Sequence, residues 1–241
     1  MGTFKLSIIV PVFNEAKTIQ KVVRRLVEVS LPLGIKKEII VIDDGSTDSS
    51  KSKIKSLKLR YKNLKLVFHA KNFGKGAAVR SGILVATGDF ILIQDADLEY
   101  DPVYIPKLLE AILAKKAKVV YGTRFVNYPL RLCGKNKTPL PSHYVANKIL
   151  NLLTNFLYGT KLTDIETGYK IFSKEALSDI KLRSNHFDIE LELTSKFLKR
   201  KFDILEVSIL AKPRNFKEGK KFNFLDGAVA FLSLFKYRFF D

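Results

Sequence analysis

The first half of the chain alternates between short apolar runs and segments with a helical spacing of apolar residues. The apolar runs, rich in β-branched residues, occupy residues 6–12, 38–44, 64–70 and 90–97. Such runs are typical of strands that are buried on both faces, as in a parallel sheet. Between the first two runs the apolar residues share one helical face, namely Ile19, Val22, Val23, Leu26 and Val27. Strand–helix–strand repetition predicts an α/β fold with a doubly wound, mostly parallel sheet.

The rest of the chain predicts further helices around one long irregular segment. Pro102 favours the start of a helix, because a proline does least harm in the first turn. Residues 125–142 contain three prolines and a glycine and predict a long loop, of the kind that usually carries function or moves. Later patterns predict helices at about 143–158 and 187–200, a strand at 203–211 and a basic loop at 212–221. We expect one domain over residues 1–223 and a separate amphipathic helix over 224–241.

Acidic residues stand at the ends of three predicted strands. Asp95 and Asp97 lie in QDADLE, Asp44 ends EIIVIDD, and Glu15 follows the first strand in PVFNE. Ligands of doubly wound sheets bind beyond the carboxyl ends of the strands. Three acidic strand ends at one edge would repel one another without cations, and carboxylates suit Mg²⁺ or Mn²⁺. The pattern therefore predicts a site for a metal ion and a nucleotide.

Each of these motifs has a simpler interpretation when it is taken alone. An isolated Asp-x-Asp is usually a solvated turn, and Glu15 needs only to favour the dipole of the next helix. The segment GKGAAV resembles a dinucleotide fingerprint, but Val79 stands where a small residue is required. We interpret it as a helix start near the predicted nucleotide site, with Lys75 facing phosphate.

Five motifs occur together in the order PVFNE, IDDGSTD, DAD, YGTRF and TDIETGYKIF. In this order they resemble family 2 glycosyltransferases with the GT-A fold, and more narrowly the polyprenyl- or dolichyl-phosphate hexose synthases. The resemblance covers nearly the whole chain, including the C-terminal segments FDIELELTSKFLKRKFDILEVSI and PRNFKEGKKFNFLDGAVAFLSLFKYRF.

The resemblance and the residues themselves together give expected roles, in which Lys75, Glu99 and Arg131 come from this sequence rather than from the family pattern. Those that would hold the nucleotide donor are Pro11, Phe13, Glu15, Ile42, Asp44, Lys75, Asp95 and Ala96. Those that would hold Mg²⁺ or Mn²⁺ are Asp95, Asp97 and Glu99, and the catalytic group would be Asp97, Arg124 and Asp164. Those that would contact the diphosphate or the acceptor are Arg124, Arg131, Arg214 and Lys220.

The activity that the resemblance implies is metal-dependent transfer of a hexose, with inversion, from UDP-glucose or GDP-mannose to a polyprenyl or dolichyl phosphate. A phosphate monoester is largely dianionic at neutral pH, because its second pKa is near ~6, and it needs little help from a base. The alternative acceptor is a saccharide or protein, whose hydroxyl group would require a base such as Asp164 or Glu190. A sugar nucleotidyltransferase, which would consume a nucleoside triphosphate, is a third interpretation.

The charge of the chain bears on its partners. It has 42 basic and 24 acidic residues, a net charge of +18, which favours a polyanionic partner or leaves a solvated basic surface. Acidic clusters at the expected binding edge, with no nucleic-acid-binding signature, argue against nucleic acid. The remaining polyanionic partners are phosphorylated substrates and an anionic membrane surface.

The C-terminal segment predicts where the protein works. A helix from Phe224 would place Phe224, Ala228, Phe231, Phe235 and Phe239 on one face, which suits a membrane interface. The alternative is packing against the protein core or against a second subunit in a homo-oligomer. No run reaches the ~20 apolar residues that span a bilayer. With one cysteine, Cys133, and no signal-sequence pattern, we expect a cytoplasmic protein bound peripherally to the cytoplasmic face of a membrane.

Overall fold

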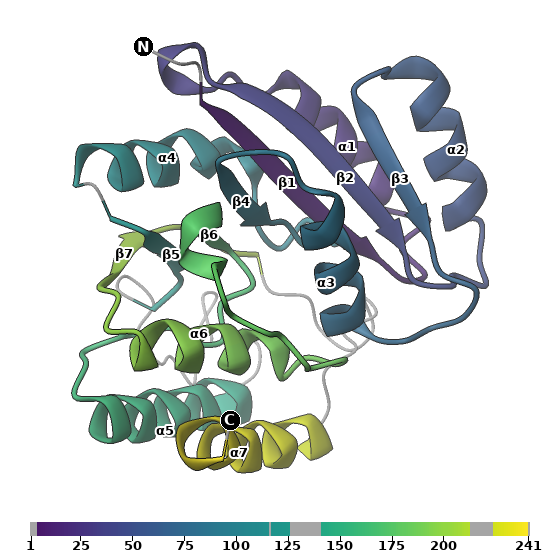
Figure 1. Cartoon of the computed structure of the whole chain (residues 1–241). Coiled ribbons are helices and arrows are strands. Elements are labelled where there is room, and N and C mark those ends of the chain that lie inside the picture. Colours follow the sequence, from purple (N-terminus) through teal and green to yellow (C-terminus); the bar gives the residue numbers. More distant parts are fainter. Residues whose placement is uncertain (1–3, 116, 126–140, 213–223, 241) are drawn as a thin grey trace, which may run out of the picture.

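A seven-stranded sheet forms the centre of the fold, with strand order β3-β2-β1-β4-β6-β5-β7 (Figure 1). The computed structural model describes residues 4–115, 117–125, 141–212 and 224–240. The strands are β1 (Lys5–Val12), β2 (Lys36–Asp43), β3 (Leu64–Phe68), β4 (Phe90–Ile93), β5 (Val119–Thr123), β6 (Lys170–Ser173) and β7 (Ile204–Ser208). Only β6 is antiparallel to its neighbours, β4 and β5. The predicted mostly parallel α/β sheet is confirmed.

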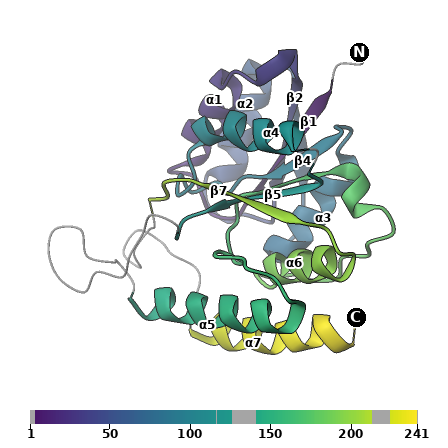
Figure 2. The same ribbon diagram turned by 90° about the vertical axis from the view of Figure 1, so that its left-hand side faces the viewer.

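The helices lie in layers on both faces of this sheet (Figure 2). They are α1 (Ile19–Glu28), α2 (Ser50–Arg60), α3 (Lys75–Val85), α4 (Ile105–Ala114), α5 (Pro141–Tyr158), α6 (Ile189–Lys199) and α7 (Phe224–Phe239). The short 3-10 helices are η1 (Pro32–Gly34), η2 (Pro102–Tyr104) and η3 (Lys174–Leu177). Helices α1, α2 and α4 cover one face, α3 and α6 cover the other, and α5 and α7 lie beyond α6.

Apolar side chains are buried on both faces of the sheet, as their uninterrupted runs predict. In β1, Leu6 and Ile8 belong to the core beneath α1 and α4, whereas Ile9 belongs to the core beneath α3 and α6. A third, smaller core joins α5, α6 and α7 through residues such as Leu150 and Leu191. The sheet is therefore fixed from both sides, which makes its carboxyl edge a rigid support for a site.

Several predicted elements are confirmed with shifted ends. The helix expected at 143–158 begins at Pro141, and Pro102 opens the short η2 directly before α4. The run at 90–97 is a strand only as far as Ile93, because the chain then turns and Leu98 adopts a positive φ of 65°. Most of the two loops predicted at 125–142 and 212–221 lies outside the described residues.

Helix α7 has one buried face and one exposed face. Leu234 and Tyr237 are buried, and the Tyr237 hydroxyl donates a hydrogen bond of 2.8 Å to Asp188 beside α6. Phe231 and Phe239, which belong to the predicted apolar face, are exposed. Among the described residues, no helix is long and apolar enough to cross a bilayer.

Candidate functional site

A cleft of about 420 Å³ opens at the carboxyl ends of β1, β2, β4 and β5. The predicted site residues that line it are Pro11, Phe13, Glu15, Asp44, Lys75, Asp95, Ala96, Asp97, Glu99 and Arg124. Ile42 is instead fully buried in the core, and Asp164 is fully buried behind the cleft wall. Arg131, Arg214 and Lys220 lie outside the described residues. The strand-end motifs thus meet in space as the sheet topology requires.

The end of β1 is tied to the loop that follows β2. Asn14 adopts a positive φ of 53°, and its side-chain oxygen accepts a hydrogen bond of 2.8 Å from the amide of Thr47. The amide of Glu15 donates to the Ser50 hydroxyl at 2.8 Å. Glu15 precedes α1, and its carboxylate accepts a hydrogen bond of 2.9 Å from the Thr18 hydroxyl. These contacts fix the direction in which PVFNE leaves the sheet.

Asp44 organises the wall of the cleft beside β2. Its carboxylate accepts hydrogen bonds from the amide of Gly74 at 2.7 Å and from the side chain of Asn72 at 2.9 Å. Nδ1 of His69 lies 2.6 Å from Asp44 Oδ1, and the other ring nitrogen lies 2.9 Å from the Ser81 hydroxyl. Gly45 has a φ of +69°, which glycine adopts without strain and which the predicted tight turn requires. Asp44 therefore holds the loop into α3; its contact with a ribose or base stays a prediction.

The DAD motif lies in the turn that follows β4. The Gln94 side chain donates a hydrogen bond of 3.0 Å to the carbonyl of Tyr100, which closes the turn. Asp97 Oδ1 accepts the amide of Glu99 at 3.0 Å. A Cβ atom at Gly168 would lie 2.4 Å from Asp95 Oδ2, so only glycine allows this approach. Because the chain turns, Asp95 and Asp97 both border the cleft.

Buried ion pairs connect Asp95 to the far side of the cleft. Lys75 Nζ lies 2.7 Å from Asp95 and 3.0 Å from Glu190, and Lys170 Nζ lies 2.9 Å from Glu190. Burial raises the pKa of Asp95 to about 6, although Lys75 opposes the shift. For Glu190 burial is outweighed by the two lysines, and its pKa lies below the usual value. A row of alternating charges thus connects α3, the turn after β4, α6 and β6.

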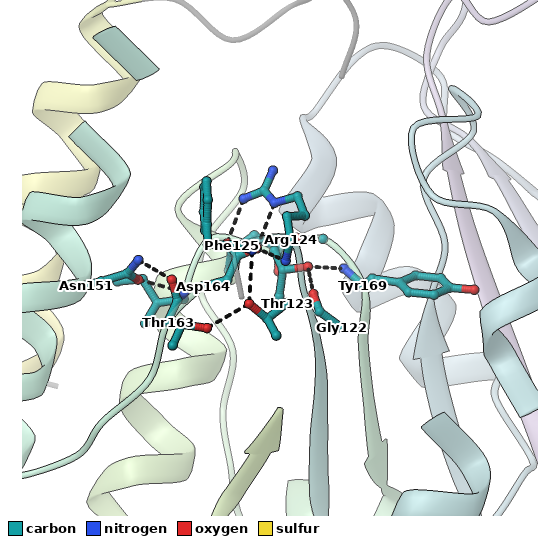
Figure 3. Close-up of polar contacts among 12 residues, drawn as sticks. Gly122, Thr123, Arg124, Phe125, Asn151, Thr163, Asp164 and Tyr169 are labelled. Atoms are coloured by element: carbon teal, nitrogen blue, oxygen red, sulfur yellow. Dashed lines mark hydrogen bonds and ion pairs between the residues drawn. The ribbon is translucent and has the colours of Figure 1, made fainter. Parts of the chain in front are cut away.

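A second ion pair joins the end of β5 to the TDIETGYK motif (Figure 3). The guanidinium group of Arg124 donates two hydrogen bonds of 2.7 Å to the two oxygens of Asp164. The backbone amides of Thr163 and Asp164 donate in turn to the carboxylate of Glu206 at 2.9 and 3.0 Å. The Asp164 carboxylate raises the pKa of Arg124 above its ordinary value, against the effect of burial. Asp164 therefore orients Arg124, which itself borders the cleft.

Several cleft residues are absent from the predicted set. Among them are Asn72, Tyr100, Asn147, Leu150, Glu166, His186 and Phe187. Burial raises the pKa of Glu166 to about 7, with Arg124 and Lys170 opposing the shift. The TDIETGYK motif could have drawn attention to Glu166, because it lies within that motif. The motif does not show, however, which of its two acidic side chains faces the cleft.

The donor set of the cleft fits a divalent metal ion shared with a substrate. Within the described ranges no three His, Cys, Asp or Glu side chains are grouped closely enough to hold an ion by themselves. Asp95 and Asp97 nevertheless both border the cleft, and Mg²⁺ is commonly held by one or two carboxylates together with substrate phosphates. The residues present match that arrangement.

The chain is similar to several known proteins. A dodecaprenyl-phosphate galacturonate synthase of Rhizobium johnstonii is 30% identical over 181 residues, which cover 75% of this chain and 51% of that protein. A dolichol-phosphate mannosyltransferase of Pyrococcus furiosus is 29% identical over 202 residues, 80% of this chain and 53% of that protein. The chain thus spans about half the length of these two relatives.

Solved structures share the fold. The glucosyl-3-phosphoglycerate synthase of Mycobacterium tuberculosis, in complex with Mn²⁺, UDP and phosphoglyceric acid, superimposes with a TM-score of 0.73 at 18% identity. The match covers 99% of this chain and 80% of that one and supports the predicted GT-A fold. The model of the glycosyl transferase family 2 matches residues 7–181. The chain therefore belongs to glycosyl transferase family 2.

Proposed function

We propose that this chain transfers a hexose from a nucleotide sugar to a polyprenyl phosphate. The observation that carries the proposal is the cleft itself, in which Asp95, Asp97 and Arg124 meet at the carboxyl edge of the sheet. The relatives named as polyprenyl-phosphate sugar transferases support this acceptor class. UDP-glucose and GDP-mannose are the two donors to be tested.

The donor side of the cleft would bind the nucleoside diphosphate. Asp95 and Asp97 would hold Mg²⁺ or Mn²⁺, and the bound ion would neutralise charge on the leaving diphosphate. From the acceptor side of the cleft, Arg124, which is directed by Asp164, would add a fixed positive charge near the diphosphate. Since Asp164 is fully buried, its placement supports a positioning role rather than contact with the sugar.

The acceptor would need alignment more than activation. Its phosphate oxygen would attack the anomeric carbon, the bond to the diphosphate would break, and its electron pair would leave with the diphosphate. Attack from the opposite side inverts the anomeric configuration. A dianionic nucleophile needs no proton removed, so catalysis would rest on alignment and on stabilisation of the leaving group.

The outer helices support a membrane position for the acceptor. Their exposed apolar side chains are Val145, Ile149, Leu152 and Phe156 on α5, and Val229, Phe231, Leu232 and Phe239 on α7. Helix α5 also borders the cleft through Asn147 and Leu150. With a net charge of +18, this apolar face would lie on an anionic membrane, next to the opening through which a lipid phosphate would enter. A homo-oligomer that covers the same face is the alternative occupant.

The test is transfer of label from a nucleotide sugar into lipid. The protein is incubated with Mg²⁺ or Mn²⁺, polyprenyl phosphate and labelled UDP-glucose or GDP-mannose, and label in the organic phase is counted. We expect label from one donor, with loss on chelation of the metal and in the Asp97→Asn variant. Asp203→Asn, an exposed site ahead of β7, is the matched control and should keep full activity.

Two results would change the proposal. Label that reaches a saccharide or protein but no lipid would keep the transferase and move the acceptor. Retention of the anomeric configuration in the lipid product would contradict direct displacement.

A further inference from the structure

Glu166 lies on the wall of the cleft that faces the donor-binding strand ends. It belongs to the segment between β5 and β6 and borders the cleft together with Arg124 and the α5 residues Asn147 and Leu150. Helix α5 carries the outward apolar face described above, so a lipid phosphate that enters from the membrane would meet this wall. Glu166 is therefore placed on the acceptor side.

The other carboxylates of this wall are already paired. Asp164 is held by two hydrogen bonds from Arg124, and Glu190 lies between Lys75 and Lys170. By contrast, the described part of the chain offers the Glu166 carboxyl group no hydrogen bond or ion pair. Neither of the bases considered from sequence, Asp164 or Glu190, is available to a ligand, whereas Glu166 is.

The charged groups around Glu166 come from each element packed near it. They are Arg124 after β5, Lys170 on β6, Glu190 on α6 and Asp164 in its own segment. The two cations are matched by the two anions through the ion pairs just described. Glu166 thus gains little net stabilisation of its charge, and burial raises its pKa to about 7.

We propose that Glu166, in its protonated form, donates a hydrogen bond to the phosphate group of the acceptor. The inference rests on the proposed function and names the residue that would distinguish a phosphate from a hydroxyl acceptor. An ionised carboxylate would repel a dianion, whereas a carboxylic acid next to a phosphate shares a proton with it, as two acids in contact do. The proton stays on Glu166 while the phosphate attacks, so no proton transfer to solvent is required.

The test is the pH dependence of kcat/KM for polyprenyl phosphate between pH 6 and 8.5. The wild-type value should rise as the phosphate becomes dianionic and fall tenfold per pH unit above about 7 as Glu166 ionises. Glu166→Gln keeps a hydrogen-bond donor of the same shape. The kcat/KM of this variant should stay within about threefold of the wild-type value at pH 7. It should not decrease above pH 7, because glutamine does not ionise. Glu166→Ala should lose about tenfold at pH 6.5, the usual cost of one unmade hydrogen bond.

The controls separate this inference from the proposed function. Glu175→Gln, an exposed site on η3, should reproduce the wild-type profile, and donor KM should be unchanged in all variants. If Glu166→Gln is as impaired as Glu166→Ala, or keeps the wild-type fall at high pH, the inference is wrong while the function stands. If wild-type protein labels no lipid at any pH, both are overturned.

Discussion

The two walls of the cleft hold their polar side chains by different means. On the wall after β1 and β2, which we propose binds the donor and call the donor wall, Asn14 and Asp44 accept hydrogen bonds from backbone amides of neighbouring loops. On the wall formed after β5 and before β6, which we propose meets the acceptor and call the acceptor wall, Arg124 and Lys170 are fixed by ion pairs with Asp164 and Glu190. A missing hydrogen bond leaves a wall largely intact, whereas a missing buried ion leaves its partner charge uncompensated. The acceptor wall should therefore be far more sensitive to substitution.

The largest effect should follow from Lys170→Met. Lys170 is fully buried, pairs with Glu190 and also donates to the carbonyl of Ile165 at 2.9 Å. Breaking a buried ion pair costs about 3–5 kcal/mol, which we expect as the loss in free energy of unfolding in urea. Lys161→Met, at an exposed lysine, should change it by less than about 0.5 kcal/mol. A loss below about 1 kcal/mol at Lys170 would remove the contrast between the walls.

Arg124→Lys should have the next largest effect. The charge remains, but lysine cannot reproduce the two parallel hydrogen bonds to Asp164. We expect a loss of about 1.5–3 kcal/mol in unfolding free energy, together with a lower kcat for sugar transfer. Arg200→Lys, after α6 on the surface, is the matched control. An unchanged free energy of unfolding would mean that the buried Asp164 carboxylate does not need the two hydrogen bonds of the guanidinium group.

On the donor wall, His69→Gln should be milder. It removes the ring that joins Asp44 to Ser81, but Asp44 keeps its hydrogen bonds from Gly74 and Asn72. A loss of about 1 kcal/mol in stability is expected, with a higher KM for the nucleotide sugar and little change in kcat. Steady-state kinetics with the donor varied would check this. A loss of unfolding free energy as large as that of Lys170→Met would show that both walls are equally sensitive to substitution.

The smallest effect on stability should come from replacing Phe231 and Phe239 together by serine. Both side chains are exposed on α7, so unfolding free energy should change by less than about 0.5 kcal/mol per site. Sedimentation with anionic vesicles should nevertheless fall several-fold, because the apolar area for the interface is lost. Leu59→Ser, at an exposed leucine on α2, should leave vesicle binding unchanged. Equal binding by both variants, with a change in oligomeric size only for the first, would favour a subunit interface.

The donor wall was largely predictable from sequence, because strand ends of a parallel sheet share one edge. Apolar runs located β1, β2 and β4, and the acids that follow them meet at the cleft. Strands β5 and β6 are five and four residues long and lie within motifs that contain polar residues. In so short a segment, the spacing of apolar residues does not identify a strand. Helix α2 lies where a helix was predicted between two apolar runs, although only Ser50, Ile54 and Leu57 of its residues are buried.

The acceptor wall was less predictable, because its chemistry depends on contacts between distant segments. The pairing of Lys170 with Glu190 and of Arg124 with Asp164 decides which acid stays available. TDIETGYK contains both Asp164 and Glu166, and nothing in the local pattern tells the clamped acid from the one that faces the cleft. Contact of the individual residues with donor, metal and acceptor stays a prediction.

The antiparallel strand β6 has a consequence for how the chain folds. In its pairing with β4, Ser173 lies opposite Phe90. One edge of β4 therefore stays unpaired until about eighty further residues have been synthesised, as the numbers of these two residues show. Non-local pairing of this kind slows folding, and an open apolar edge invites association with other chains. Strands β1, β2, β3 and β4 are synthesised first, and β6, which joins β4 to β5 in the sheet, begins with Lys170. Closure of the sheet therefore also places Lys170, the fully buried cation of the acceptor wall.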